Sequence, residues 1–269
     1  KYGGGDATVS NSGDITISSG IEQEYGFNYA VGINASTGEY GGSAIVSNSG
    51  DITITNSADG DAVGIRASSS GKYAEGSTVV NNSGDIMVSS PYQAAGIWAT
   101  STNDASIYNS GNITVASEEG RARGLYAIAD DGVGTIINSG DLSVVGGIGV
   151  VGAGAAGSYG ATTINTGDIS VTSTRYEVLT DYYGVDYYAG GWAYGAFAAT
   201  RVRGVAAVIN SGDIDVNGIT RGTGLSANSR FGSTYIANEG DLTVNGELES
   251  AYGIYTSGNS REEFIDEET

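Results

Sequence analysis

Apolar and polar residues alternate along the chain in short runs that are separated by a recurring corner motif. The runs at 44–48 (AIVSN) and 51–54 (DITI) lie on either side of one motif, and each predicts a strand, because successive side chains of a strand point to opposite faces. A third pattern, Gly-apolar-x-Ala, as at 32–35 (GINA), predicts one more strand. We expect all three kinds of strand to be short, about three to five residues each.

The corner motif is Asn-Ser-Gly-Asp followed by an apolar–polar–apolar triplet, and it occurs throughout the chain. One copy has Asn112 in place of Asp, and two copies have Thr166 and Glu239 in place of Ser. The bare repeat is about 27 residues long, and three of the spacings between copies are longer. The copies begin at Asn11, Asn48, Asn82, Asn109, Asn138, Asn165, Asn210 and Asn238.

Three short strands and tight corners in each repeat predict a coil of a β-solenoid. We therefore expect an all-β chain, a single-stranded parallel β-helix of about eight triangular coils, with the right-handed crossovers that parallel strands prefer. The whole chain, 1–269, is predicted to be one domain. Insertions are expected near 18–43, 55–77 and 172–194, and residues 259–269 are expected to form a charged tail or a cap.

The repeated Asn residues are predicted to form a buried ladder. The residue two positions before each Asn is apolar in seven of the eight copies, as with Val46 before Asn48, so the Asn shares the inward face. Coils stacked about 4.8 Å apart would let neighbouring amides hydrogen bond, which makes burial of the amides tolerable. The Gly of the motif is expected to supply a positive φ at the corner.

The alternation of Asn-Ser-Gly-Asp-Ile with Gly-Ile-x-Ala resembles the passenger repeats of Gram-negative autotransporter adhesins. The resemblance covers essentially the whole chain. It implies a β-helix displayed at a cell surface, with a role in adhesion or in cell–cell contact.

Composition narrows the range of functions. The net charge of −20 disfavours nucleic acid and anionic membranes as partners. The sequence contains no Cys and no His, which removes thiolate sites and the commonest general base. No apolar run approaches the ~18 residues of a membrane-spanning helix. The sequence shows no signal peptide, so we interpret it as mature or excised extracellular material, and we do not expect an enzyme.

Two outward columns of side chains are candidate binding sites. Asp residues at the corners, among them Asp14, Asp51 and Asp85, are weak candidates for calcium between coils, whereas a turn-forming role explains them without any metal and is preferred. Thr and Ser residues such as Thr16 and Thr53 form a second column that could match an ice lattice, but such residues are common in strands without any such role. No other cofactor is expected.

The longest insertion is rich in aromatic residues with acidic neighbours, and it is the strongest candidate for contact with a partner. The alternative is that these rings only cover an apolar flank of the helix. Its aromatic residues are Tyr176, Tyr182, Tyr183, Tyr187, Tyr188, Trp192 and Tyr194.

The sequence thus predicts a non-enzymatic extracellular structural or adhesive surface protein. Its expected partners are cell-surface or matrix glycans and proteins, or other copies of itself stacked head to tail into filaments. The alternative is a polysaccharide-binding or depolymerising β-helix, which would need carboxylates that converge in a cleft.

Overall fold

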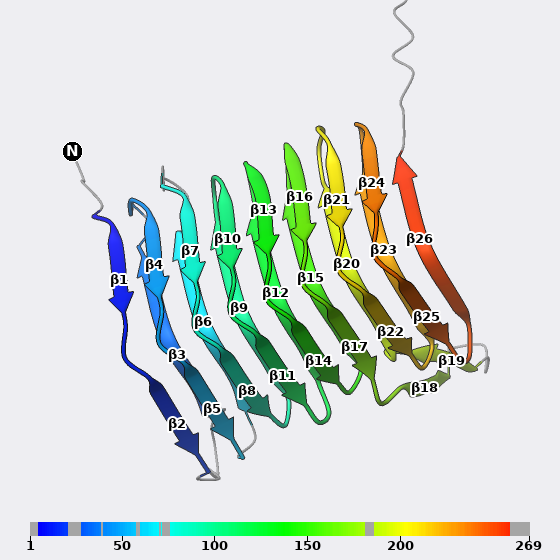
Figure 1. Cartoon of the computed structure of the whole chain (residues 1–269), viewed down its shortest axis with the longest axis horizontal. Coiled ribbons are helices and arrows are strands. Elements are labelled where there is room, and N and C mark those ends of the chain that lie inside the picture. Colours follow the sequence, from blue (N-terminus) through cyan, green and yellow to red (C-terminus); the bar gives the residue numbers. More distant parts are fainter. Residues whose placement is uncertain are drawn as a thin grey trace, which may run out of the picture.

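The computed structural model describes residues 5–20, 28–38, 40–57, 60–69, 71, 76–180 and 186–258; the side chains of 28, 179–180 and 186–188 are outside this description. The described residues form three eight-stranded parallel sheets and one two-stranded antiparallel hairpin (Figure 1). No helix in the described part of the chain is long and apolar enough to cross a membrane.

Sheet A consists of β1 (Ala7–Asn11), β4 (Ala44–Asn48), β7 (Thr78–Asn82), β10 (Ala105–Asn109), β13 (Val133–Asn138), β16 (Gly160–Asn165), β21 (Ala206–Asn210) and β24 (Thr234–Asn238). Sheet B consists of β2 (Ile15–Ser19), β5 (Ile52–Asn56), β8 (Ile86–Ser90), β11 (Ile113–Ser117), β14 (Leu142–Gly146), β17 (Ile169–Ser173), β22 (Ile214–Gly218) and β25 (Leu242–Gly246). Sheet C consists of β3 (Asn28–Thr37), β6 (Gly60–Ser69), β9 (Gln93–Ser101), β12 (Arg121–Ala129), β15 (Gly149–Gly157), β20 (Trp192–Thr200), β23 (Arg221–Ser229) and β26 (Ser250–Gly258). The hairpin is β18 (Glu177–Thr180) with β19 (Asp186–Ala189).

The chain visits sheets A, B and C in turn, and each strand pairs in parallel with its equivalents in the neighbouring coils. The register brings each motif Asn opposite the next, as with Asn48 and Asn82. The predicted parallel β-helix is confirmed, with eight strands in every sheet and therefore eight coils.

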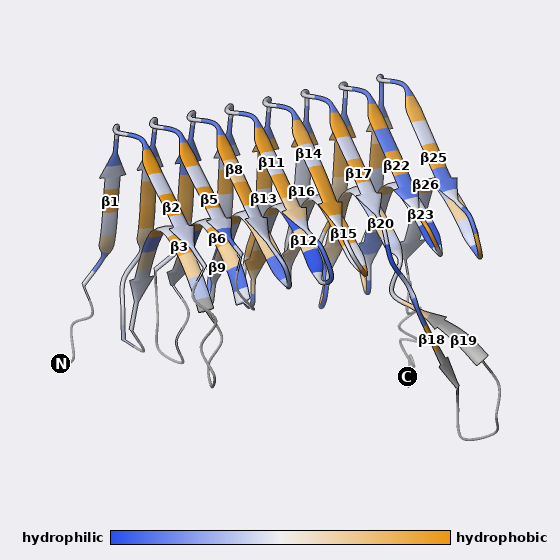
Figure 2. Ribbon diagram, turned by 90° about the horizontal axis from the view of Figure 1, so that it is seen from below, coloured by the Kyte–Doolittle hydropathy of each residue, from blue (hydrophilic) through white to orange (hydrophobic). Residues whose placement is uncertain are grey.

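The core fills the space enclosed by the three sheets. Residues of β4 and β5 alternate between buried and more exposed positions, with Val46, Ile52 and Ile54 fully buried. Figure 2 shows apolar bands at matching positions along neighbouring strands, so each core residue stacks on a similar residue of the next coil. Such stacking buries apolar area continuously along the axis.

The prediction for the third strand was too short. Strands of sheet C have nine or ten residues, and inner strands such as β6 and β9 contain buried residues on both sides of the Gly in Gly-apolar-x-Ala. A Cβ on Gly64 would lie 2.6 Å from the carbonyl oxygen of Gly96 and 2.6 Å from the Ile86 side chain. Glycine therefore lets the strand pass close to both the core and the next coil.

The explanation predicted for the corner glycines was also wrong. Among the described residues, positive φ occurs at Gly190, Gly191 and Gly204, none of which belongs to the motif. The motif glycines are needed for space instead: a Cβ on Gly111 would lie 2.1 Å from the carbonyl oxygen of Gly84 in the preceding coil. Corners stack so closely that no side chain fits between them.

The described residues refine the three insertion ranges. The ranges 18–43 and 55–77 each include a whole sheet C strand, β3 and β6, so the additional residues lie on either side of those strands. The third range overlaps the end of β17 and the start of β20, and the added element is the β18–β19 hairpin. The charged segment 259–269 lies outside the described residues.

Candidate functional site

The eight motif Asn residues form one column, named here the Asn column. In the first seven, Nδ2 donates to Oδ1 of the Asn in the next coil, at 2.7–2.8 Å. The same Nδ2 also donates to the carbonyl oxygen of the Gly two residues later, at 2.5–2.7 Å. The six inner members, from Asn48 to Asn210, are buried. These bonds satisfy amide groups that would be costly to bury alone, so the column stabilises the stack.

The corner acidic residues form a second column, the Asp column, on the exposed side of the same corners. In the first seven of its eight members, Oδ1 accepts a hydrogen bond from the backbone N–H of the equivalent residue in the next coil, at 2.7–3.0 Å. The turn-forming role predicts a hydrogen bond to the residue's own turn, but the observed hydrogen bond joins successive coils. Its members are Asp14, Asp51, Asp85, Asn112, Asp141, Asp168, Asp213 and Asp241.

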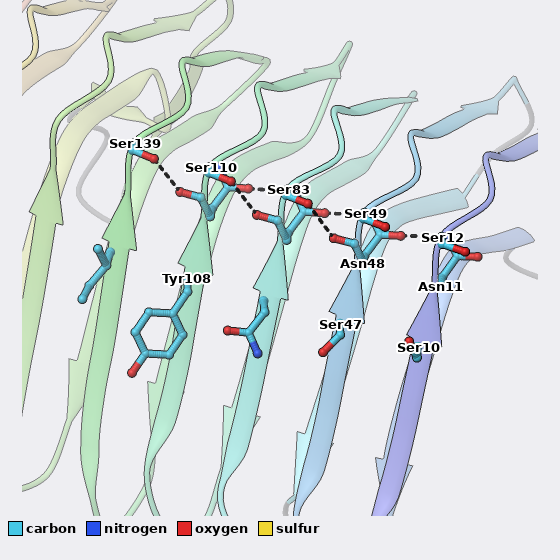
Figure 3. Close-up of a pocket in the computed structure, with 14 residues that line it drawn as sticks. Ser10, Asn11, Ser12, Ser47, Asn48, Ser49, Ser83, Tyr108, Ser110 and Ser139 are labelled. Atoms are coloured by element: carbon cyan, nitrogen blue, oxygen red, sulfur yellow. Dashed lines mark hydrogen bonds between the residues drawn. The ribbon is translucent and has the colours of Figure 1, made fainter.

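Two shallow grooves run beside these columns. One follows Ser and Asn residues of sheet A from Ser10 to Ser139, where Ser Oγ groups donate to Asn carbonyl oxygens of the preceding coil (Figure 3). The other lies between the Asp column and the hydroxyls of sheet B, such as Thr114. In the described part of the chain no group of three or more acidic residues is arranged to hold a metal ion. Calcium at Asp14, Asp51 or Asp85 stays a prediction.

The aromatic residues predicted as one cluster divide into separate groups. Tyr176 is exposed at the base of the hairpin. Tyr182 and Tyr183 lie outside the described residues. Tyr187 and Tyr188 belong to β19, whose backbone pairs with that of β18. Trp192 and Tyr194 are not in the insertion at all: they belong to β20, and their rings are in contact with each other at 5.6 Å.

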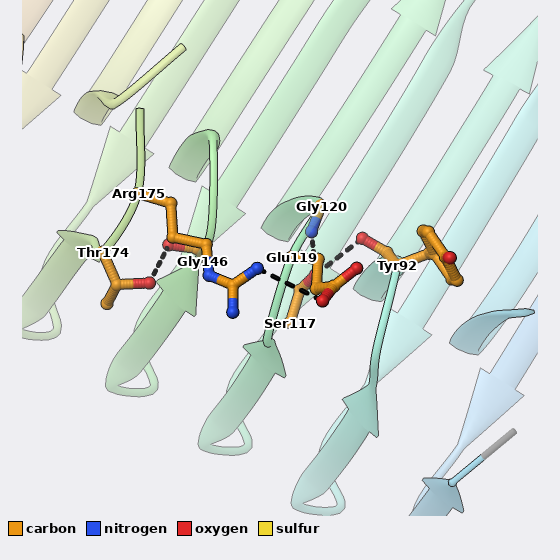
Figure 4. A network of polar contacts seen from close by, with 7 residues as sticks. All are labelled: Tyr92, Ser117, Glu119, Gly120, Gly146, Thr174 and Arg175. Carbon is orange, nitrogen blue, oxygen red and sulfur yellow. Dashed lines mark hydrogen bonds and ion pairs between the residues drawn. The ribbon is translucent and has the colours of Figure 1, made fainter. Parts of the chain in front are cut away.

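Polar contacts attach the insertion to the coils beneath it (Figure 4). Thr174 Oγ1 donates to the Gly146 carbonyl oxygen at 3.1 Å, and Arg175 Nη1 lies 3.2 Å from Glu119 Oε1. Both side chains of this ion pair are about half exposed, so the pair contributes little to stability. The backbone N–H of Arg175 also donates to Gly147 at 2.9 Å, which fixes where the hairpin begins.

Trp192 and Tyr194 belong to a larger surface, the sheet C face, which sequence reasoning missed. Ring contacts run from Trp98 on β9 to Tyr126 on the neighbouring β12, and from there across β15 to Phe197 on β20, at 6.4 and 6.1 Å between centroids. Phe197 also contacts Tyr194 at 6.2 Å. These edge-on contacts hold the rings in fixed orientations on a rigid sheet.

Arginines lie among these rings. The Arg123 guanidinium lies 5.4 Å from the Trp98 ring centroid and 5.2 Å from that of Tyr126, within the range of cation–π attraction. Burial lowers the pKa of Arg123, and Asp61 acts in the opposite direction. Burial likewise raises the pKa of Asp61, against the effects of Gln93 and Arg123. The guanidinium stays charged near neutral pH because the ordinary pKa of arginine lies far above that pH.

A hollow of about 350 Å³ opens on the sheet C face. It lies over β15, whose outward positions include Val151 and the glycines 149 and 154. The ring of Phe197 lies against Gly154, where a Cβ would be 2.3 Å from it. The hollow is lined by Arg121, Arg123, Tyr126, Val151, Trp192, Tyr194, Phe197, Ala199, Ser226 and Asn228.

Five of the arginines are divided between strands of sheet C and a corner. Arg121 and Arg123 are in β12 and Arg221 is in β23, whereas Arg201 and Arg203 do lie in a corner. A signal was present in the sequence: the third position of Gly-apolar-x-Ala is Trp98, then Tyr126, in consecutive repeats. Aligning that position by repeat would have placed both rings in one outward column.

Fold and surface together define the class of this molecule: a parallel β-solenoid with a regular hydrogen-bonded corner and one aromatic, arginine-bearing face. No family model, no curated protein and no solved structure matches the chain.

Proposed function

We propose that this solenoid is a non-enzymatic extracellular surface protein that adheres to partners through the sheet C face. One observation carries the proposal: oriented rings and arginines occupy the solvent side of a sheet whose other side is a rigid core. Aromatic and Arg side chains are the residues that dominate binding surfaces. The resemblance of the repeats to autotransporter passengers supports display at a cell surface.

The depolymerising alternative is less well supported. Glycoside cleavage ordinarily uses two carboxyl groups about 5–10 Å apart across the scissile bond. The described residues that line the hollow include no Asp or Glu. The hollow therefore favours binding without bond cleavage, and the polysaccharide-binding form of the alternative remains compatible with it.

Adhesion of beads that carry the chain tests this function. We expect beads to adhere to cells or to extracellular matrix, and Trp192→Ala combined with Tyr194→Ala to reduce adhesion. A matched control is Tyr235→Ala, which removes a ring that is 53% exposed on the outer side of sheet A. Equal adhesion by all three proteins would overturn the role of the sheet C face, and no adhesion by any of them would overturn the function.

Head-to-tail assembly is a second proposal, and it is supported by the polarity of the columns. In every step of the Asn column the earlier coil donates to the later one. A second copy stacked in sequence would continue this pattern, with Asn238 donating to Asn11 of the next copy. Salt should promote such stacking because it screens the charge of −20 on each copy.

Light scattering at rising salt tests assembly. Ile17→Lys places a charge at a core position of the first coil, whereas Ser18→Lys places the same charge on the outer face of the same strand. We expect the first substitution to prevent growth and the second to permit it. Monomers at every salt and protein concentration would exclude the filament.

A further inference from the structure

The charge of the molecule is unevenly distributed among its sheets. The chain as a whole carries 31 acidic and 11 basic residues. In the strands of sheet C, basic residues outnumber acidic ones. Asp61 is the one acidic residue in these strands, and the basic residues are the arginines 66, 121, 123 and 221. An acidic molecule thus presents one locally basic face, and that face is also the aromatic one.

The hollow combines three kinds of binding group within one site. Trp192, Tyr194 and Phe197 on β20 offer ring surface, and each is partly exposed. Arg121 and Arg123 on β12 are on the other side of the small residues of β15. Asn228, whose Nδ2 donates to Ser226 Oγ at 3.0 Å, adds polar atoms from β23.

The two arginines of the hollow form no direct ion pair within the described residues, although Asp61 attracts Arg123, so their N–H groups can bind an external anion. Within the described part of the chain, ion pairs occur at Arg175–Glu119 and Arg201–Asp130, and neither involves Arg121 or Arg123. The Arg123 guanidinium lies over the rings of both Trp98 and Tyr126, and these two contacts restrict its movement. A fixed guanidinium loses less freedom when its N–H groups bind the two oxygens of an anion.

We infer that the hollow on the sheet C face binds an acidic polysaccharide through a carboxylated or sulfated sugar ring. This inference rests on the proposed adhesive function and names the chemistry of its partner. The apolar C–H face of a sugar packs on the rings of β20, and the anionic group binds Arg121 and Arg123. A volume of about 350 Å³ is near the lower end of small-molecule sites, so the hollow takes on the order of one or two sugar rings.

Matched polymers test this chemistry on the full chain. Polygalacturonate is compared with its neutral methyl ester, and dextran sulfate with dextran, by titration calorimetry at low and at high salt. We expect at least one anionic polymer to bind about tenfold or more tightly than its neutral match, because a charge-assisted hydrogen bond contributes that much. The two pairs distinguish a carboxylate from a sulfate. Affinity for the anionic polymer should fall as salt rises.

Charge-matched variants locate the site. Arg121→Gln with Arg123→Gln should weaken binding about tenfold or more. Arg175→Gln with Arg201→Gln changes the net charge equally but acts on surface ion pairs elsewhere, and it should leave affinity unchanged. Arg121→Gln alone, at an exposed position, should still weaken binding measurably if the double variant fails to fold. Trp192→Ala should weaken binding as well.

Three results would overturn the inference: equal affinity for anionic and neutral polymers, equal losses in the two double arginine variants, or no binding to any of the four polymers. The inference and the adhesive function fail separately. Adhesion that depends on Trp192 and Tyr194 without polymer binding would retain the function and point to a protein partner. Polymer binding without adhesion of the beads would retain the inference and exclude the adhesive role.

Discussion

The Asn column and the Asp column occupy the same corners, three residues apart, but they differ in burial and in chemistry. An inner Asn such as Asn109 is 3% exposed and uses its amide both to donate and to accept. An Asp such as Asp141 is exposed and only accepts, from the backbone N–H of Asp168. All eight positions of the Asn column are Asn, whereas Asn112 replaces Asp in the Asp column and accepts a hydrogen bond from the Asp141 N–H at 3.0 Å. Burial, more than hydrogen bonding itself, determines how strictly the residue is specified.

Exchanging the residue types between the columns should give the sharpest contrast. Asn109→Asp removes the donor to Gly111 and Asn138 and places a buried carboxylate against two oxygen atoms. We expect a loss of about 3–5 kcal/mol in the free energy of unfolding at neutral pH. Burial would raise the pKa of the new carboxyl, so the deficit relative to wild type should shrink as pH falls and a proton restores a donor. Urea denaturation at several pH values measures this, and a loss independent of pH would contradict the explanation.

Close stacking of the corners should give the next largest effect. Gly111→Ala puts a Cβ 2.1 Å from the Gly84 carbonyl oxygen, and we expect a loss of about 2–3 kcal/mol from overpacking. Gly13→Ala is the matched control at the same motif position in the first coil, where a Cβ would meet nothing within 4 Å. Equal melting shifts for the two variants would mean that conformation, and not space, selects glycine here.

A smaller effect is expected when the outer column loses its acceptor. Asp141→Leu deprives the Asp168 N–H of its side-chain partner, and the net contribution of such a bond is about 0.5–1.5 kcal/mol. Water reaches this exposed site, so the loss should lie in the lower part of that range. Thermal unfolding measures it, and a loss as large as that of Asn109→Asp would remove the distinction between the columns.

The smallest effect belongs to Asp141→Asn. The amide keeps an acceptor oxygen, as Asn112 does in the preceding coil, so stability should change by less than about 0.5 kcal/mol. Any gain would come from weaker repulsion with Asp168, and it should disappear at high salt. Melting temperatures at low and high salt measure the difference, and a clear destabilisation at both would show that the charge itself stabilises the corner.

The repeated motif made most of the fold predictable. Each Asn marks the end of a sheet A strand, and alternation assigns the inward residues of sheets A and B. The length of the sheet C strands was not predictable in the same way, because consecutive buried residues around glycines such as Gly64 interrupt the alternation. A pattern of period two identifies only the part of a strand that keeps that period.

The aromatic surface of sheet C was harder to predict because its residues come from different repeats. Trp98, Tyr126 and Phe197 are far apart in the sequence and become neighbours only through the register of β9, β12, β15 and β20. The sequence favours the aromatic-rich insertion as a contact site because its rings are close together along the chain. Spatial clustering in a solenoid follows position within the coil, so composition along the chain is a poor guide to it.

The constant corner has a consequence for how such a molecule changes in length. Every coil presents the next with the same donors, the same acceptors and the same glycine contact, although the residues per coil vary because insertions leave at the corners flanking sheet C. A genetic exchange between two copies of the motif would therefore add or delete whole coils in phase. The rod would lengthen or shorten in steps of about 4.8 Å while every junction kept its geometry. The number of Asn-Ser-Gly-Asp copies therefore sets the length of the rod, and the insertions at the corners flanking sheet C can vary in size without changing that length.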